Sequence, residues 1–171
     1  FGPGFKRSVK LKVPKVISLG RMSISANGRV ATILYRKDGG VEDPDTVGVF
    51  DTRSGRKLAQ LTLPARRAAR VLGAALSPDG RTVAVFGDEH KGKAALLRIY
   101  RVGRGKPKLL HRWRDRAEGT CYSAAFAPDG RTLALGTERR LLLWDARKGR
   151  RIAARSDNTD PGARELAVDL L

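Results

Sequence analysis

The residues with the clearest capacity for chemistry are Asp88, Glu89 and His90, which follow one another directly. Carboxylates and imidazoles bind metal ions when several of them converge on one point. Three consecutive residues at a strand end point in different directions, and the sequence has no second cluster of such ligands. We therefore predict no metal site.

A glycine-rich stretch, Gly103-Arg104-Gly105-Lys106, is a second candidate. Phosphate-binding loops open a helix, whose N-terminal amides hold the anion. This stretch instead joins two runs with strand character, so we interpret it as a tight basic hairpin. The chain also lacks the GxxxxGKS/T and GxSxG patterns and any evident pairing of a nucleophile with a base. We predict no catalytic residue and no cofactor, so any enzymatic activity would lie outside this segment.

Cys121 is the only cysteine, which excludes an intrachain disulfide. It stands in an apolar strand pattern, which predicts a small buried hydrophobic residue. No apolar run approaches the roughly 18–20 residues of a membrane-spanning helix. No signal-peptide pattern is evident either. We expect no membrane segment and a cytoplasmic location.

The elements that would position these residues are clearest at 125–147, AFAPDGRTLALGTERRLLLWDAR. Asp-Gly between two apolar runs predicts a hairpin, because glycine takes the positive φ of the turn without a Cβ clash. Arg139 and Arg140 separate the second run from a third, which ends in Trp144-Asp145. A further turn leads into 151–155, so this stretch predicts four antiparallel strands.

The same pattern occurs three times. The turn glycines are Gly28, Gly80 and Gly130, spaced by 52 and then 50 residues. A repeat of roughly 40–50 residues with four strands per unit is typical of β-propeller blades. We therefore predict an all-β chain, a partial β-propeller of about three four-stranded antiparallel blades.

Two of the turns carry a family resemblance. Residues 77–81 read SPDGR, residues 127–131 read APDGR, and the third run of the last unit ends in Trp144-Asp145. In these features the chain resembles the bacterial branch of WD40-repeat propellers over nearly its whole length. Phe50-Asp51 is a weaker match. The resemblance implies a scaffold for protein–protein interaction.

The repeats are degenerate. Well-formed WD40 repeats join a Gly-His pair, a Ser or Thr, the Trp and an Asp in one hydrogen-bonded network, and this chain has no Gly-His pair. The second unit has Tyr100-Arg101 where the third has Trp-Asp. Propellers that resemble the TolB and YVTN types use the same turn, so an extracytoplasmic propeller of that kind is an alternative.

We assign structural roles to the repeated positions. Polar side chains start the turns, the following glycines take the left-handed conformation, and large rings end each third strand to fill the gap between blades. The residues are Asn27, Gly28, Phe50, Asp51, Asp79, Gly80, Tyr100, Asp129, Gly130, Trp144 and Asp145.

The repeat predicts a division of the chain. We expect the outer strand of a preceding blade at 1–15, blades at 16–63, 64–113 and 114–155, and a linker with the first strand of a further blade at 156–171. Both ends would then be cut in mid-blade. We expect the remaining blades of a longer chain to be partners of this segment.

The net charge of +18 comes mainly from arginine. Nucleic acid is one partner that such a charge fits. The basic residues are dispersed over turns and strand ends, which favours a solvated surface and a coding bias instead. Nucleic-acid or other polyanion binding through a basic face is therefore the less favoured alternative.

The family topology, carried over, divides the connections between two faces. One face is almost purely basic, and the other has longer loops of mixed sign, where binding usually lies on a rigid scaffold. We predict a protein partner on the mixed face. The candidate partner-binding residues are Arg66, Arg67, Asp88, Glu89, Arg114, Arg116 and Glu118.

Overall fold

A computed structural model of the protein describes residues 10–11, 13, 16–37, 46–62, 69–89, 93–103 and 105–155. Over these residues the chain is all-β, with three four-stranded sheets in which every pair of neighbouring strands is antiparallel. The strand predicted within 1–15 falls almost entirely outside the described residues, and the one within 156–171 does so completely. The division of the chain into blades stays a prediction.

We call each of the three sheets a blade, and the strands of each follow in chain order. Blade 1 contains β1 (Val16–Ile24), β2 (Val30–Lys37), β3 (Thr46–Asp51) and β4 (Lys57–Thr62). Blade 2 contains β5 (Ala69–Leu76), β6 (Thr82–Glu89), β7 (Ala94–Arg101) and β8 (Lys108–Asp115). Blade 3 contains β9 (Cys121–Phe126), β10 (Thr132–Thr137), β11 (Leu141–Asp145) and β12 (Arg150–Arg155).

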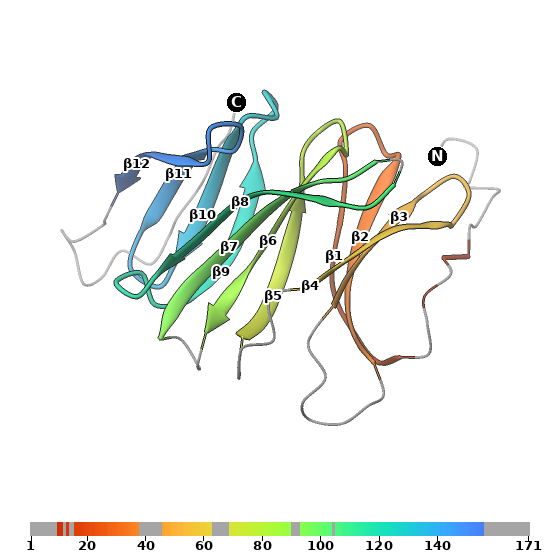
Figure 1. The fold of residues 1–171 in the computed structure, drawn as a ribbon, viewed down its shortest axis with the longest axis horizontal. Helices are drawn as coiled ribbons and strands as arrows, with labels where there is room; N and C mark the ends of the chain where they lie inside the picture. The colour runs from red at the N-terminus through yellow and green to blue at the C-terminus, as the bar shows by residue number, and fades with distance from the viewer. Residues whose placement is uncertain are drawn as a thin grey trace, which may run out of the picture.

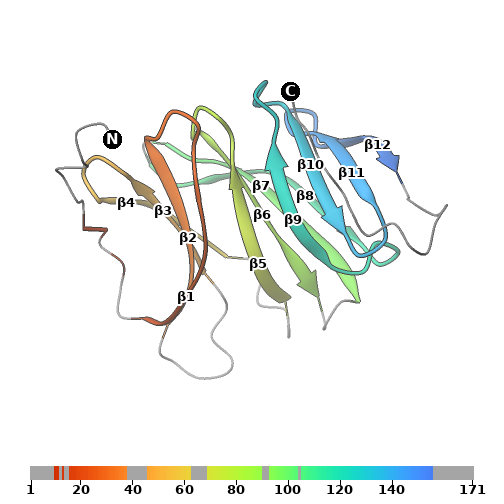
Figure 2. The same ribbon diagram turned by 180° about the vertical axis from the view of Figure 1, so that it is seen from behind.

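The blades lie side by side in chain order (Figures 1 and 2). Their first strands are neighbours, since β5 contacts both β1 and β9. Arg21 of β1 also reaches blade 3, where its guanidinium donates to the carbonyl of Tyr122 at 2.8 Å. The first strands therefore lie where the three sheets come closest together, as the innermost strands of propeller blades do.

Turns between first and second strands have the geometry that their sequences require. Gly28, Gly80 and Gly130 have φ angles of 67°, 70° and 62°, a conformation that costs glycine little. In the third turn Asp129 accepts the backbone N–H groups of Arg131 and Thr132, each at 2.8 Å. This is why a short acidic side chain precedes the glycine.

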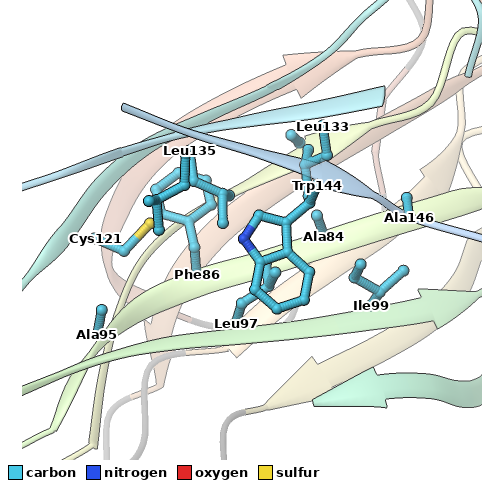
Figure 3. Close-up of a cluster of buried hydrophobic side chains, with 12 residues drawn as sticks. Ala84, Phe86, Ala95, Leu97, Ile99, Cys121, Leu133, Leu135, Trp144 and Ala146 are labelled. Atoms are coloured by element: carbon cyan, nitrogen blue, oxygen red, sulfur yellow. The ribbon is translucent and has the colours of Figure 1, made fainter. Parts of the chain in front are cut away.

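Packing between blades forms the core. Blade 2 contributes to both sides through the alternation of β6: Val83 and Val85 pack towards blade 1, and Ala84 and Phe86 pack towards blade 3. Both faces of the blade are thus buried, which explains its near-continuous apolar strands. Figure 3 shows the cluster between blades 2 and 3.

Large rings end the third strand of each blade and are buried. Tyr100 belongs to the cluster shared with blade 1, and Trp144 to the cluster shared with blade 2, so each ring packs against the preceding blade. Trp144 also meets Trp113 edge-on, with ring centroids 5.4 Å apart. Phe50, at the same position of blade 1, is fully buried as well. A register shift directly precedes each ring, so the same bulge recurs in all three blades.

The cluster between blades 2 and 3 yields a prediction. Leu135 is fully buried there. Leu135→Ala should lower the free energy of unfolding by about 2–5 kcal/mol, because it removes buried methyl groups and leaves a cavity. Chemical denaturation followed by circular dichroism measures this. Leu109→Ala is the control, since Leu109 is 41% exposed, and equal midpoints for the two variants would contradict the packing.

Candidate interaction site

Two ends of the blades carry different charges. We define the turn face as the end with the β1–β2, β3–β4, β5–β6, β7–β8, β9–β10 and β11–β12 turns, and the loop face as the opposite end. Exposed basic side chains are numerous on the turn face, and they include Arg29, Arg53, Arg56, Arg81, Arg101, Lys106, Arg131, Arg147, Lys148 and Arg150. Its described acidic residues are Asp51, Asp79, Asp129 and Asp145.

Asp145 organises the turn face of blade 3. One carboxylate oxygen accepts the backbone N–H groups of Arg147 and Lys148, at 3.0 and 2.9 Å. The other accepts Nε and Nη2 of Arg131, at 3.0 and 2.8 Å. Above all the Arg131 guanidinium, together with these N–H groups, lowers the pKa of Asp145 to about 2. Both oxygens of the Asp145 carboxylate thus accept hydrogen bonds from residues of blade 3.

The other turn carboxylates are also bound to their own turns. Ser54 lowers the pKa of Asp51 through its hydroxyl and its N–H, which both reach the carboxylate at 2.7 Å. Burial favours a higher pKa for Asp79, but the Ser77 hydroxyl and the Arg81 N–H outweigh it and hold the pKa below its usual value. The backbone N–H of Thr132 has the largest part in lowering the pKa of Asp129.

A groove of about 760 Å³ opens on the turn face between blades 2 and 3. Its lining residues are Pro78, Asp79, Arg81, Thr82, Arg101, Leu110, His111, Pro128, Asp129, Gly130, Ala146 and Arg147. Three of them are exposed arginines, Arg81, Arg101 and Arg147. In the part of the chain that the structure describes, none of the three forms an ion pair. The groove therefore offers guanidinium groups to an anionic ligand.

One wall of the groove is a contact between blades. His111 of β8 has its Nε2 2.9 Å from the carbonyl oxygen of Arg147 in blade 3. Gly149 has a φ of 66°, and a β-carbon there would overlap the imidazole of His111. This close approach fixes the turn that carries Arg147 relative to blade 2.

The loop face neutralises much of its own charge. Asp88 is fully buried, with its Oδ2 2.6 Å from Nη2 of Arg70 and 3.4 Å from the Thr120 hydroxyl of blade 3. Glu118 is fully buried too, with its Oε1 2.8 Å from Nε of Arg140. A carboxylate removed from solvent needs such partners. Asp88 and Glu118, predicted to bind a partner, are thus engaged within the fold, and their partner-binding role stays a prediction that no observation tests.

The remaining candidates on the loop face differ from one another. Glu89 and Arg114 form an ion pair, and Arg116 is exposed. Arg66 and Arg67 lie outside the described residues. A partner-binding role for these five stays a prediction.

Glu118 also changes the network that the family resemblance implied. The Thr137 hydroxyl donates to its Oε2 at 3.0 Å. The indole N–H of Trp144 is buried and has no hydrogen-bond partner among the residues that the structure describes. Glu118 thus binds the threonine without joining the tryptophan.

Chemical sites of other kinds are not found in the described part of the chain. Its His, Cys, Asp and Glu residues form no group of three or more that could hold a metal ion, and His90 lies outside it. No helix there is long and apolar enough to span a membrane. Cys121 is buried, and burial raises the pKa of its thiol to about 12.

The groove was not among the predicted sites, although one feature of the sequence indicates it. Blade 2 has Arg101 at the position where blades 1 and 3 have Asp51 and Asp145. That exchange removes a carboxylate beside Arg81.

Comparisons with known proteins place the fold. No protein-family model and no curated protein matches the chain. Among solved structures, the β-propeller domain of the Trilobed protease from Pyrococcus furiosus matches with a TM-score of 0.58 and 13% identity, over 85% of this chain and 44% of that one. The chain is therefore built as part of a β-propeller.

Two further structures match at a similar level. One is a putative 6-phosphogluconolactonase from Bacteroides fragilis, with a TM-score of 0.58 and 14% identity, over 86% of this chain and 40% of that one. The other is the complex of KlAtg21 with the coiled coil of AgAtg16, with a TM-score of 0.54 and 21% identity, over 75% of this chain and 39% of that one. The chain spans about two fifths of the length of these structures.

The pKa of Asp145 predicts an acid dependence. A carboxyl with a pKa of about 2 in the folded chain and 3.8 otherwise stabilises the fold above pH 3.8, and that contribution is lost as the pH falls towards 2. Asp145→Asn should therefore lose less stability over this range than the wild type, as thermal unfolding at several pH values would show. Glu138→Gln, at an exposed loop-face position, is the control. An unchanged acid dependence in Asp145→Asn would contradict the assignment.

The buried thiol yields another prediction. Cys121 should react with a thiol reagent such as dithionitrobenzoate at pH 8 only after denaturant is added, because the reactive thiolate is both buried and disfavoured. Absorbance of the released chromophore measures this. Rapid reaction in the folded protein would show that the contact between blades 2 and 3 opens readily.

Proposed function

We propose that this β-propeller segment is a rigid scaffold for protein–protein interaction, with no catalysis of its own, and that it binds its partner through the turn face. The observation that carries this proposal is the contrast between the two faces. Ion pairs on the loop face use Arg70, Arg114 and Arg140. On the turn face, the described residues form only the pair of Arg131 with Asp145.

Unpaired surface arginines favour an anionic partner. Guanidinium groups bind carboxylates with two parallel hydrogen bonds, and arginine is enriched in protein interfaces. The turns that carry these residues belong to strands packed between blades, so little ordering is needed when a partner binds. A preorganised basic surface suits recognition of an acidic protein surface.

A protein fits the turn face better than a nucleic acid does. Asp79 and Asp129 line the same groove as the arginines, and both have pKa values below the usual range, so they are negative at neutral pH. Closely spaced phosphates would be repelled by them more strongly than a single carboxylate placed at the arginines. No Phe, Tyr or Trp is among the residues that line the groove, and its one imidazole, that of His111, is held against the carbonyl of Arg147, so bases would find little stacking surface there. Polyanion binding remains the second candidate, favoured by the net charge alone.

One structural neighbour supports the choice of a protein partner. KlAtg21, whose structure is similar to this chain, is bound to the coiled coil of AgAtg16. Other neighbours are a protease propeller and a putative 6-phosphogluconolactonase. At 13% and 14% identity, this likeness supports no transfer of catalysis.

Further blades of a longer chain are part of this proposal. Met22 and Ile24 on β1 are 69% and 63% exposed, and Ile152 on β12 is 57% exposed. Such residues on the first and last blades suit the packing of neighbours at both ends. WD40 membership and a cytoplasmic location also remain proposals, with a TolB- or YVTN-type propeller as the alternative.

Charge reversal tests the turn face. Arg81, Arg147 and Lys148, each replaced by Glu in one variant, should weaken binding of a fluorescein-labelled decapeptide of alternating Glu and Gly by about tenfold, because exposed charge pairs contribute up to about 1 kcal/mol each. Fluorescence anisotropy at about 100 mM salt measures this. The control variant replaces the exposed Arg112, Arg139 and Arg155 by Glu.

Outcomes separate the candidates. Equal weakening in both variants would point to net charge alone and contradict a specific turn-face site. A generic DNA duplex that binds more tightly than the peptide in the same buffer would favour polyanion binding, with an affinity that falls steeply with salt.

A further inference from the structure

Blades 2 and 3 share one backbone arrangement at the place where the turn before the second strand meets the end of the third strand. We call this place the corner of the blade. In blade 3 the N–H of Ala146 donates to the carbonyl of Arg131 at 2.8 Å, and in blade 2 the N–H of Val102 donates to the carbonyl of Arg81 at 2.8 Å. The residue before the donor is Asp145 in blade 3 and Arg101 in blade 2. The two corners thus differ mainly in the charge of one side chain.

In blade 3 the corner is internally neutral. Asp145 accepts two hydrogen bonds from the Arg131 guanidinium, at 3.0 and 2.8 Å. In blade 2 the corresponding guanidinium, that of Arg81, has a second arginine in place of this carboxylate. Neither Arg81 nor Arg101 forms an ion pair with any residue that the structure describes. Asp79 is close enough for the charge of Arg81 to lower its pKa, so this corner holds two arginines against one carboxylate and keeps positive charge for an external anion.

The groove places this corner where a ligand can reach it. Arg81 and Arg101 lie on the wall from blade 2, and Arg147 lies on the wall from blade 3. The contact of His111 with the Arg147 carbonyl holds the second wall in place. Pro78 and Pro128 add apolar surface between the charges. An extended chain would find both charged and apolar contacts there.

We propose that Arg81 and Arg101, together with Arg147, bind an aspartate or glutamate side chain from an extended acidic segment of the protein partner. This ligand carboxylate takes the place at blade 2 that Asp145 takes at blade 3. The proposal rests on the function proposed above and assigns the contact to one corner. A single carboxylate fits better than a run of phosphates because Asp79 and Asp129 carry negative charge within the same groove.

The variant Arg101→Asp tests this directly. It supplies a carboxylate beside Arg81, as blade 3 has beside Arg131. This internal carboxylate would pair with Arg81 in place of the ligand carboxylate. In the full chain we expect binding of the labelled Glu-Gly decapeptide to weaken at least about tenfold. The far-ultraviolet circular dichroism should be unchanged, and the melting temperature should be equal or higher, since the new ion pair replaces a repulsion.

Arg112→Asp is the matched control. Arg112 is an exposed arginine of the same blade, on β8, and does not line the groove. The charge change is identical, so we expect peptide binding to stay within about twofold of the wild type. Equal losses in Arg101→Asp and Arg112→Asp would overturn the proposal.

Other outcomes distinguish this inference from the proposed function. If Arg101→Asp binds the peptide as the wild type does, while the turn-face charge-reversal variant does not, the corner is wrong and the turn face stands. If the wild type itself binds no acidic peptide, the turn-face function fails with it. If inorganic phosphate or a DNA duplex binds in an Arg101-dependent way and the peptide does not, the ligand is a phosphate and the peptide proposal is overturned.

Discussion

Packing of one blade against the next is the constraint on which the rest of this structure depends. A four-stranded sheet whose strands are apolar on both faces is not stable alone, because each of its two faces must be covered by a neighbouring sheet. Blade 2 has both neighbours, and the alternation along β6 divides its side chains between them. The buried rings Tyr100 and Trp144 close the space between blades. The stacking also buries Asp88 and Glu118 on the loop face and forms the two walls of the groove on the turn face.

The stacking buries charged side chains on the loop face and leaves those on the turn face largely exposed. On the loop face the stack removes Asp88 and Glu118 from solvent, and each is paired with an arginine that remains partly exposed. Loss of either arginine would leave a buried charge without its partner, which is costly. On the turn face the carboxylates bind their own turns, and apart from Arg131 no described arginine there forms an ion pair. One end of the stack is thus neutralised internally, and the other is open to a partner.

Sequence alone was enough for the elements and not for the site. Asp-Gly turns and alternating apolar residues are local features, so the three blades and their strands could be predicted from them. The burial of Asp88 and Glu118 could not, because it depends on blade 3 lying against blade 2, and both residues resemble solvated loop residues in the sequence. The groove combines Arg81, Arg101 and Arg147 from separate turns. Only the departure from the Trp-Asp pattern at Tyr100-Arg101 marked its position.

The equivalent corners of blades 2 and 3 bear on how such a surface could change over time. A repeat protein carries several copies of one corner, and each copy is stabilised mainly by its own blade. Exchange of an acidic for a basic residue in one copy gives up one ion pair and the hydrogen bonds to the adjacent turn, such as those that Asp145 makes, and leaves the packed strands in place. Recognition could therefore be gained or lost at one corner by a single codon change, while the remaining copies preserve the architecture.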